Sequence, residues 1–410
     1  MRGIVSWITD ATRDQKRSLL AAFLGYMLDA MDVMLYAFVL GQVQREMHLS
    51  AAMSGAMMSA TLVAAAAGGI AFGYIADRFG RTRALTSSIL IYSLATAACG
   101  FTHTALQLVL CRVVLGLGMG GEWAAGAALV AETWPAKHRG KALALVQSAW
   151  AVGYALGAVL VAMVMPRYGW RAVFFAGVIP ALVTLWFRHG IQESDPWQRQ
   201  AAETKARPPA SQLFRGALGR NTLICATMNA CALFAWWGLF TWVPSFLSRP
   251  VAEGGRGLNI VQTSSWTITM QVGTFLGYLV FGYIADRVNR KYTYIGFLLI
   301  AACLVPLFAF VHSPNALLAI GPLVGFFGTG YFSGFSVIAS ELFPTSLRGT
   351  AMGFVYNIGR VLSAAAPWLI GSISDMAGLS AALCITSVAF LLAAWIATSL
   401  QLPAVARSSP

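Results

Sequence analysis

The sequence predicts an all-α membrane protein with twelve transmembrane helices in two six-helix bundles. Three observations support this fold class: an apolar composition, a regular series of long apolar runs, and an internal duplication. Of the 410 residues, 58% are hydrophobic and 10% are charged, whereas soluble proteins average about 25% charged residues. A water-soluble core cannot bury that much apolar surface, so the expected solvent is the bilayer.

Apolar runs of about 20 residues match the hydrocarbon thickness of a bilayer, and irregular backbone cannot face lipid, so each run is expected to be a helix. The polar stretch 191–219 has no apolar periodicity and is expected to be a cytoplasmic linker between bundles at 1–190 and 220–410. The expected spans are 19–41, 53–75, 84–101, 105–133, 141–164, 170–190, 221–247, 262–285, 293–311, 314–341, 350–372 and 379–400.

The duplication is visible as two motifs that recur at one offset. The sequence GYIADR begins at Gly73 and again at Gly282, and an acid-and-arginine motif begins at Glu132 and again at Glu341. Both offsets are 209 residues. A shared offset indicates a repeated structural unit. In the second copy of the first motif, Asn289 replaces a glycine.

The distribution of positive charge predicts the topology. The net charge is +13, which in a soluble protein would suggest nucleic acid, but no soluble domain is expected that could present such a surface. If both termini lie inside, the inner segments contain 21 of the 28 Lys and Arg residues and the outer loops contain 5. This bias predicts an inner-membrane protein with both termini in the cytoplasm.

Several other functional classes lack their sequence signals. The six cysteines lie in apolar runs without metal-ligand spacing to histidine, so no metal is expected. The chain contains no Gly-rich phosphate loop, and no cofactor is expected. The five histidines fall at loops or span ends, which argues against an intramembrane enzyme. Trp170 and Trp242 lie near span ends and are expected to anchor the protein at the membrane interface.

Over essentially its whole length, the chain resembles transporters of the major facilitator superfamily. The residues that carry this resemblance are the loop motif from Gly73 to Arg83 and the run from Arg112 to Gly120 in the fourth span. The resemblance implies two bundles of six helices and transport by alternating access. It also marks Arg112 as the arginine of a motif that is often tied to proton coupling.

A narrower resemblance is to the sialate:proton and aromatic-acid:proton symporter branches, which carry organic anions. Its residues are Asp29-Ala-Met-Asp32, Gly120-Gly-Glu122-Trp123, Gln192-Glu-Ser-Asp-Pro-Trp197 and Asn357-Ile-Gly-Arg360. The resemblance implies that the pair of aspartates in the first helix handles protons and that a basic residue handles the substrate carboxylate.

Charged residues inside the spans are the strongest candidates for function, because each costs about 2.5–3.5 kcal/mol to insert. Asp29, Glu122 and Arg360 each lie roughly 15 Å into their spans, at 1.5 Å per residue, and Asp32 follows Asp29 on the same helix face. These groups are expected to converge near the midplane. Burial of neighbouring acids favours their protonated form, so one of them can load and release a proton.

Structural interpretations stay open for each of these charges. Asp29, Asp32 and Glu122 could be permanently paired acids that hold helices together. Arg112 could be structural, bonding to backbone carbonyls or to an acid. Arg360 is expected to bind a carboxylate with its planar guanidinium, and its alternative is an ion pair within the protein.

Two further sets complete the candidate residues. Polar and aromatic residues inside the spans are candidates for lining a substrate cavity; those predicted to bind substrate with Arg360 are Asn357, Tyr331, Tyr36, Gln147 and Gln271, and Trp150, Asn229, Trp236, Trp237 and Tyr356 are further candidates. Charges at the span ends are expected to latch the cytoplasmic side as gating residues, with topology signals as the alternative: Asp77, Arg78, Arg81, Glu132, Arg139, Asp286, Arg287, Glu341 and Arg348.

The sequence therefore predicts a proton-coupled symporter of a small organic anion such as a monocarboxylate, working as a monomer by alternating access. Its expected partners are the anion, protons and the lipid bilayer, without nucleic acid. The alternatives are a carrier of the same fold for a neutral or zwitterionic metabolite such as a sugar or osmolyte, a proton-driven exporter, and a non-transporting nutrient sensor.

Overall fold

The structure is a computed structural model that describes residues 7–188, 210–344 and 347–401. Its elements are helical throughout these ranges, and no strand occurs in them. The first group is α2 (Arg13–Glu46), α3 (Ala51–Phe79), α4 (Arg81–Cys99), α5 (Ala105–Thr133) and α6 (Ala136–Arg188). The second group is η1 (Ala210–Phe214), α8 (Gly216–Phe240), α9 (Val243–Ser248), η2 (Val251–Glu253), α10 (Ile260–Arg287), α11 (Arg290–Phe310), α12 (Pro314–Leu342), α13 (Arg348–Ser363), α14 (Ala365–Ala377) and α15 (Leu379–Thr398).

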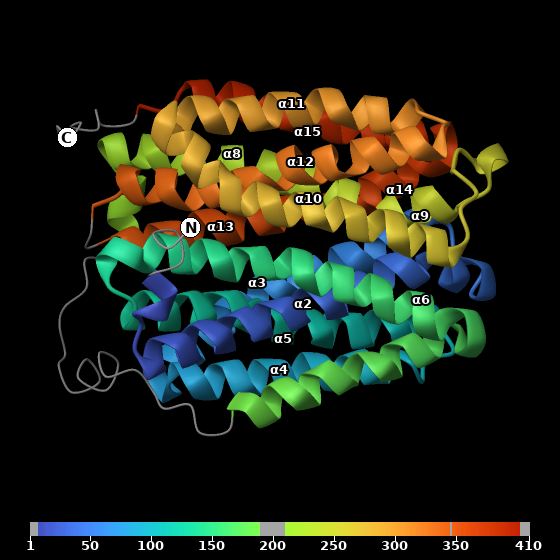
Figure 1. Cartoon of the computed structure of the whole chain (residues 1–410), viewed down its shortest axis with the longest axis horizontal. Coiled ribbons are helices and arrows are strands. Elements are labelled where there is room, and N and C mark those ends of the chain that lie inside the picture. Colours follow the sequence, from blue (N-terminus) through green and yellow to red (C-terminus); the bar gives the residue numbers. More distant parts are fainter. Residues whose placement is uncertain (1–6, 189–209, 345–346, 402–410) are drawn as a thin grey trace.

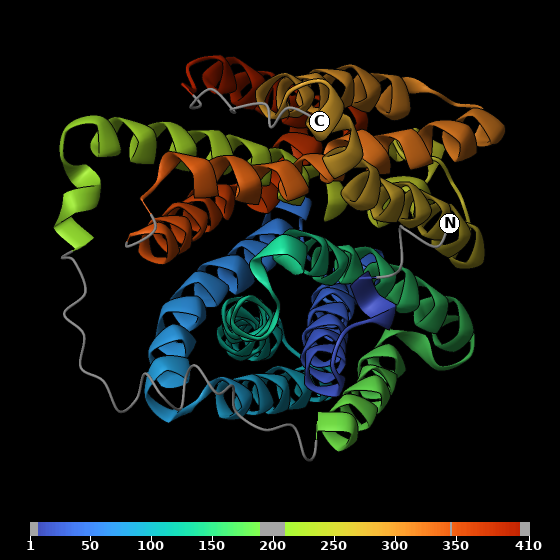
Figure 2. The same ribbon diagram turned by 60° about the vertical axis from the view of Figure 1, so that its left-hand side comes forward.

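The two groups form two helical halves that lie side by side, and the axes of the long helices are roughly aligned (Figure 1). The larger interfaces between the halves join α6 to α10 and α3 to α14. One end of the molecule, here called the linker end, carries the connections α3–α4, α5–α6 and α10–α11. The opposite end, here called the far end, carries the connections α2–α3 and α4–α5 and the segment 249–259. Figure 2 shows the same halves after rotation.

The helices account for twelve passes, which confirms the predicted fold class. In the described part of the chain, nine stretches are long and apolar enough to cross a membrane, and one of them, Lys137–Ile179, is 43 residues long. That stretch holds two passes, because α6 is interrupted at Gly169, where φ is 74°. The helix α4 and the broken pair α13 and α14 supply the remaining passes.

Local sequence signals explain where several helices begin. Thr12, Thr104 and Asn259 each precede a helix, and the side chain of each accepts a hydrogen bond from the backbone of a glutamine three residues later. Each glutamine side chain in turn accepts a hydrogen bond from the backbone N–H of the capping residue. Two backbone donors at the helix start are therefore satisfied. These caps fix the start of α2, α5 and α10.

Two passes are broken close to prolines. α8 ends at Phe240 and α9 begins at Val243, one residue before Pro244. α13 ends at Ser363, and α14 begins at Ala365, two residues before Pro367. Proline lacks a backbone N–H and so removes one helical hydrogen bond. The predicted single spans 221–247 and 350–372 are therefore each divided into two helices.

The repeated turns differ in backbone geometry. Gly80, between α3 and α4, has φ 110°, whereas Asn289, between α10 and α11, has φ 170°. The first value favours glycine, and the second is extended backbone that any residue adopts. Asn289 also accepts a hydrogen bond from the backbone N–H of Lys291 at 2.9 Å. The replacement of glycine by Asn289 in the second copy of the motif thus has a local structural reason.

The turn motif itself is more helical than the sequence indicates. The segment from Gly73 to Phe79 forms the last turns of α3, so the turn is confined to Gly80. At the linker, η1 and the start of α8 already occupy residues 210–219. The domain boundaries at 190 and 220 stay a prediction, since residues 189–209 lie outside the described ranges.

Candidate functional site

A small cavity of about 20 Å³ lies between the two halves. Its walls come from α2 and α6 of the first half and from α8, α10, α12 and α13 of the second. The lining residues are Tyr26, Gln147, Trp150, Leu233, Trp236, Trp237, Tyr278, Phe332, Tyr356 and Arg360. Aromatic side chains therefore make up most of the wall, and one guanidinium supplies the positive charge.

Three tryptophans form a rigid corner of this cavity. The ring centroid of Trp150 lies 5.5 Å from that of Trp236 and 5.8 Å from that of Trp237, both in edge-on geometry. Trp236 and Trp237 are 4.8 Å apart at 85°. Edge-to-face packing at these distances is favourable beyond the burial of the rings. The corner joins α6 to α8 across the two halves.

Arg360 is the charged residue of the cavity wall. It is 3% exposed, and its guanidinium carbon lies 5.5 Å from the centre of the Tyr356 ring. Its Nε has no hydrogen-bond partner within the described residues. A buried, planar donor without a partner is suited to an anionic ligand, because a carboxylate would satisfy it with charge-assisted hydrogen bonds.

The two aspartates of α2 meet different partners. Asp29 and Asp32 are each 1% exposed. Asp29 interacts electrostatically with Arg360 of the second half and with Glu122 and Asp32 of its own half. Asp32 faces Thr96 of α4 and the guanidinium of Arg112. The structure thus brings Asp29 toward Arg360 and directs Asp32 into the interior of the first half.

Arg112 lies at the centre of a buried cluster. It is fully buried, its Nε donates to Thr61 Oγ1 at 3.2 Å, and its Nη2 lies 3.3 Å from the sulfur of Met58. Its guanidinium stacks over Tyr36 at 4.3 Å, and the Tyr36 hydroxyl donates to the carbonyl of Ser54 at 3.0 Å. Tyr36 therefore belongs to this cluster rather than to the cavity wall.

The other predicted binding residues are spread over several places. Gln147 lines the cavity, and its Nε2 donates to the Tyr26 hydroxyl at 3.5 Å. Tyr331 is buried and donates to the carbonyl of Ala232 at 2.8 Å. Gln271 is buried in α10, and Asn357 donates to Gly353 within its own helix at 2.9 Å. Tyr331, Gln271 and Asn357 are not among the described residues that line the cavity.

At the linker end, an ion-pair network connects the second-half motifs. Arg290 pairs closely with Glu341 and lies 3.7 Å from Asp286. Arg290 was not predicted from the sequence as a gating residue, whereas Arg287, three residues earlier, was. The offset of 209 residues would have found it, because Arg290 is the repeat partner of Arg81.

The first-half counterparts are described in part. Arg78 donates to the Tyr74 hydroxyl at 2.8 Å, and Arg139 donates to the carbonyl of Trp134 at 3.4 Å. Glu132 also interacts with another residue. The side chains of Asp77, Arg81 and Arg348 lie outside the described residues. The gating role of these positions stays a prediction.

Four cavity residues were not predicted from the sequence: Tyr26, Leu233, Tyr278 and Phe332. Tyr26 lies one helical turn before Asp29, so a search of the helix face that carries the acid would have found it. Phe332 is the neighbour of the predicted Tyr331. Tyr278 has no distinguishing sequence signal, since its position depends on the rotation of α10 against α6.

The two tryptophans that were expected at the membrane interface are buried instead. Trp242 is fully buried, and its Nε1 donates to the carbonyl of Pro367 at 3.1 Å. Trp170 is 3% exposed and donates to Glu46. The interface-anchor interpretation was wrong, because both indole N–H groups find partners inside the protein.

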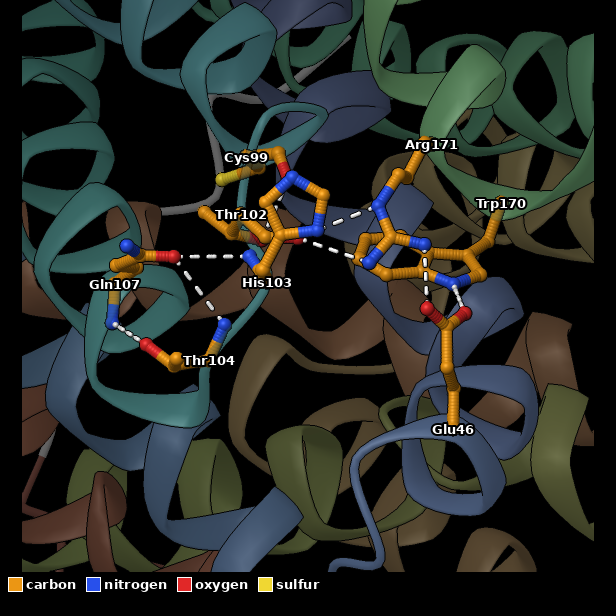
Figure 3. A network of polar contacts seen from close by, with 8 residues as sticks. All are labelled: Glu46, Cys99, Thr102, His103, Thr104, Gln107, Trp170 and Arg171. Carbon is orange, nitrogen blue, oxygen red and sulfur yellow. Dashed lines mark hydrogen bonds and ion pairs between the residues drawn. The ribbon is translucent and has the colours of Figure 1, made fainter.

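A polar network at the far end, away from the cavity, connects three helices (Figure 3). Glu46 accepts hydrogen bonds from Trp170 Nε1 and from Arg171 Nη1, both at 2.6 Å. Arg171 also donates to the carbonyl of Thr102 at 3.0 Å and stacks on Trp170 at 4.3 Å. The hydrogen bonds from Trp170 and Arg171 hold the pKa of the Glu46 carboxyl below its usual value.

Comparison with known proteins identifies the family. Residues 22–251 and 255–409 match the family described as Major Facilitator Superfamily. The cis,cis-muconate transport protein of Acinetobacter baylyi is 32% identical over 88% of this chain and 88% of its own length. The sialic acid transporter NanX of Escherichia coli is 30% identical over 94% of each chain.

The fold agrees with a solved structure. The crystal structure of a D-xylose-proton symporter superposes with a TM-score of 0.75 over 94% of this chain and 98% of that chain, at 20% identity. The helices of this chain form a multi-pass membrane protein, and its relatives are transporters rather than enzymes. The chain belongs to the Major Facilitator Superfamily.

Proposed function

We propose that this transporter is a symporter that moves a small organic anion together with protons by alternating access. The observation that carries the proposal is the buried guanidinium of Arg360, which lies in an aromatic cavity between the two halves and within electrostatic range of Asp29. The guanidinium offers a binding group for a carboxylate, and the acid offers a site for the coupled proton.

The relatives support an acidic substrate. The names of two of them specify cis,cis-muconate and sialic acid, and both compounds carry carboxylate groups. The cavity has a volume of about 20 Å³, far below that of small-molecule sites, which begins at about 300 Å³, so the two halves must move apart before a substrate binds. The flat aromatic faces of the tryptophan corner favour a planar acid over a bulky sugar acid.

The proposed cycle uses competition for Arg360. When Asp29 is ionised, its carboxylate attracts Arg360 and disfavours binding of the anion. When Asp29 takes up a proton, that attraction is lost and the substrate carboxylate pairs with Arg360. Anion and proton are therefore loaded together, and their release on the other side of the membrane restores the interaction between Asp29 and Arg360.

The proposal includes an orientation in the membrane. With 21 Lys and Arg residues in one set of loops and 5 in the other, both termini lie in the cytoplasm and the protein lies in the inner membrane. In this orientation the far end faces outside. At the far end, Asp375 accepts hydrogen bonds from the backbone N–H groups of Ala51 and Ala52, and Arg249 donates to Gln44. These bonds join the two halves, so the described conformation is closed at that end.

The proposal is tested by uptake into proteoliposomes with an imposed pH gradient, acidic outside, using radiolabelled cis,cis-muconate and benzoate. We expect wild-type protein to accumulate at least one of these acids. Arg360→Ala should weaken binding by about 2–5 kcal/mol, the usual result of removing one partner of a buried charge pair, which is about 30-fold or more in Kd. Arg360→Lys should restore part of the affinity, because it keeps the charge but loses the planar fork.

The matched control is Arg220→Ala. Arg220 is exposed at the start of α8, where it bonds to Gln401 outside the cavity, so uptake should stay at the wild-type level. Asp29→Asn should abolish accumulation while exchange of labelled for unlabelled acid continues. Unaltered affinity in Arg360→Ala, or accumulation that ignores the pH gradient, would refute the symport of an organic anion.

A further inference from the structure

We propose that Tyr26 is a positioning residue whose hydroxyl couples protonation of Asp29 to binding of the anion at Arg360. This inference rests on the symport function proposed above. Tyr26 lies on α2 three residues before Asp29, so both side chains project from the same face of the helix. Tyr26 is also part of the cavity wall.

The surroundings of Tyr26 connect the acid with the binding site. Tyr26 is 4% exposed and lines the same cavity as Arg360. It interacts electrostatically with both Asp29 and Arg360, and also with Tyr278 and Tyr356 of the second half. A change of charge at Asp29 therefore changes the electrostatic potential at Tyr26, next to the proposed binding site of the anion.

Two contacts hold the Tyr26 ring in place. The ring packs against Trp150 with centroids 5.2 Å apart and an angle of 50°. The amide Nε2 of Gln147 donates to the hydroxyl oxygen at 3.5 Å. Gln147 is the donor in this bond, so the hydroxyl's own proton stays available for a bond to another acceptor.

The acceptor changes during the proposed cycle. An ionised Asp29 is the stronger acceptor, and the Tyr26 hydroxyl then stabilises the charged acid in the empty carrier. When Asp29 is protonated, the carboxylate of the bound anion takes over this hydrogen bond beside Arg360. The hydroxyl thus favours either the ionised acid or the bound anion, which makes proton uptake and anion binding interdependent. The phenol keeps its proton throughout.

The substitution Tyr26→Phe isolates this role, because it keeps the ring against Trp150 and removes only the hydroxyl. Two assays in proteoliposomes separate coupling from binding. Accumulation of cis,cis-muconate is driven by an imposed pH gradient, and counterflow exchanges labelled for unlabelled acid at equal pH. Because the bound anion also loses a hydrogen bond in this variant, counterflow is measured at saturating acid, where weaker binding is offset. We expect counterflow to fall only about twofold and accumulation to fall about tenfold or more, in the usual range of coupling effects.

The matched control is Tyr294→Phe. Tyr294 is fully buried in α11, its hydroxyl has no hydrogen-bond partner in the described part of the chain, and it is not among the described residues of the cavity wall. Both assays should give wild-type values for this variant. If Tyr26→Phe does not fold, Tyr26→Met replaces it, because the flexible methionine fills the space without a hydroxyl.

The outcomes separate this inference from the proposed function. If wild-type protein accumulates neither cis,cis-muconate nor benzoate, the symport proposal itself fails. If the wild type accumulates acid and Tyr26→Phe does so equally well, the coupling role of the hydroxyl is refuted. Equal losses in accumulation and counterflow would also refute it, since the hydroxyl would then be a simple binding group.

Discussion

At the scale of single residues, the interior of the first half contains several buried ionisable side chains. Arg112, Asp32 and Asp29 are each at most 1% exposed. Arg112 is held by Thr61 and by the ring of Tyr36. Asp32 interacts electrostatically with this guanidinium, whereas Asp29 interacts with Arg360 of the cavity wall. The two aspartates therefore have different surroundings although they are neighbours on one helix.

This arrangement predicts that Arg112 stabilises the first half by compensating the charge of Asp32. Removing one partner of a buried charge pair leaves the other uncompensated and costs about 3–5 kcal/mol. We expect Arg112→Ala to lower the thermal unfolding midpoint of the purified protein strongly. The second substitution Asp32→Asn should restore part of the loss, because it removes the uncompensated charge. Additive losses in the double variant would contradict this electrostatic account.

At the scale of elements, the ends of helices are joined by side chains from distant segments. Glu46 is the last residue of α2 and lies beyond the predicted span 19–41. Trp170 and Arg171 follow the break in α6 at Gly169, and Thr102 follows α4. One carboxylate and one guanidinium therefore hold three helix ends together at the far end (Figure 3).

The network predicts a dependence of stability on pH. The usual pKa of a glutamate is 4.5, and the bonds from Trp170 and Arg171 lower the pKa of Glu46 in the folded state. Because the folded-state pKa is the lower one, this contribution to stability is complete above about pH 4.5 and is lost as the pH falls through the folded-state value.

We expect Glu46→Gln to lower the thermal midpoint at neutral pH and to reduce the further loss on acidification. The matched control is Asp14→Asn, an exposed acid in the first turn of α2 without these partners. The measurement is the unfolding midpoint of detergent-purified protein from pH 7 to pH 3. Curves for wild type and Glu46→Gln that coincide at every pH would show that the network does not stabilise the fold.

At the scale of the whole molecule, the two halves are fastened at the far end. Asp375 at the end of α14 accepts hydrogen bonds from the backbone N–H groups of Ala51 and Ala52, at 3.1 and 3.0 Å, and so caps the first turn of α3 from the other half. Arg249 donates to Gln44 at 3.0 Å across the same boundary. Opening at the far end must break these contacts.

We expect Asp375→Ala to shift the protein toward the conformation that is open at the far end. Loss of a helix cap costs about 0.5–2 kcal/mol, and each 1.4 kcal/mol changes an equilibrium about tenfold. Pulsed electron paramagnetic resonance between spin labels at His103 and Val251, in a background without native cysteines, should show more of the longer distances. Asp14→Ala is the control, and an unchanged distance distribution in Asp375→Ala would rule out this latch.

The sequence by itself determined the properties that the bilayer imposes along the chain. The apolar runs fixed the number of passes, and the comparison with the family confirmed the fold. The offset of 209 residues revealed the duplication, and the positions of Asp29 and Arg360 marked the depth at which a site was expected. These signals are readable because length, hydropathy and charge are properties of single segments.

Only the tertiary structure decided which side chains meet. It placed Gln147 and the unexpected Tyr26 in the cavity wall, moved Tyr36 to the Arg112 cluster, and paired Arg290 with Glu341. Such pairings depend on the rotation and crossing of helices that are distant in the chain. A helix tolerates a polar residue on any face that is covered by a neighbour, so periodicity alone does not determine the partner.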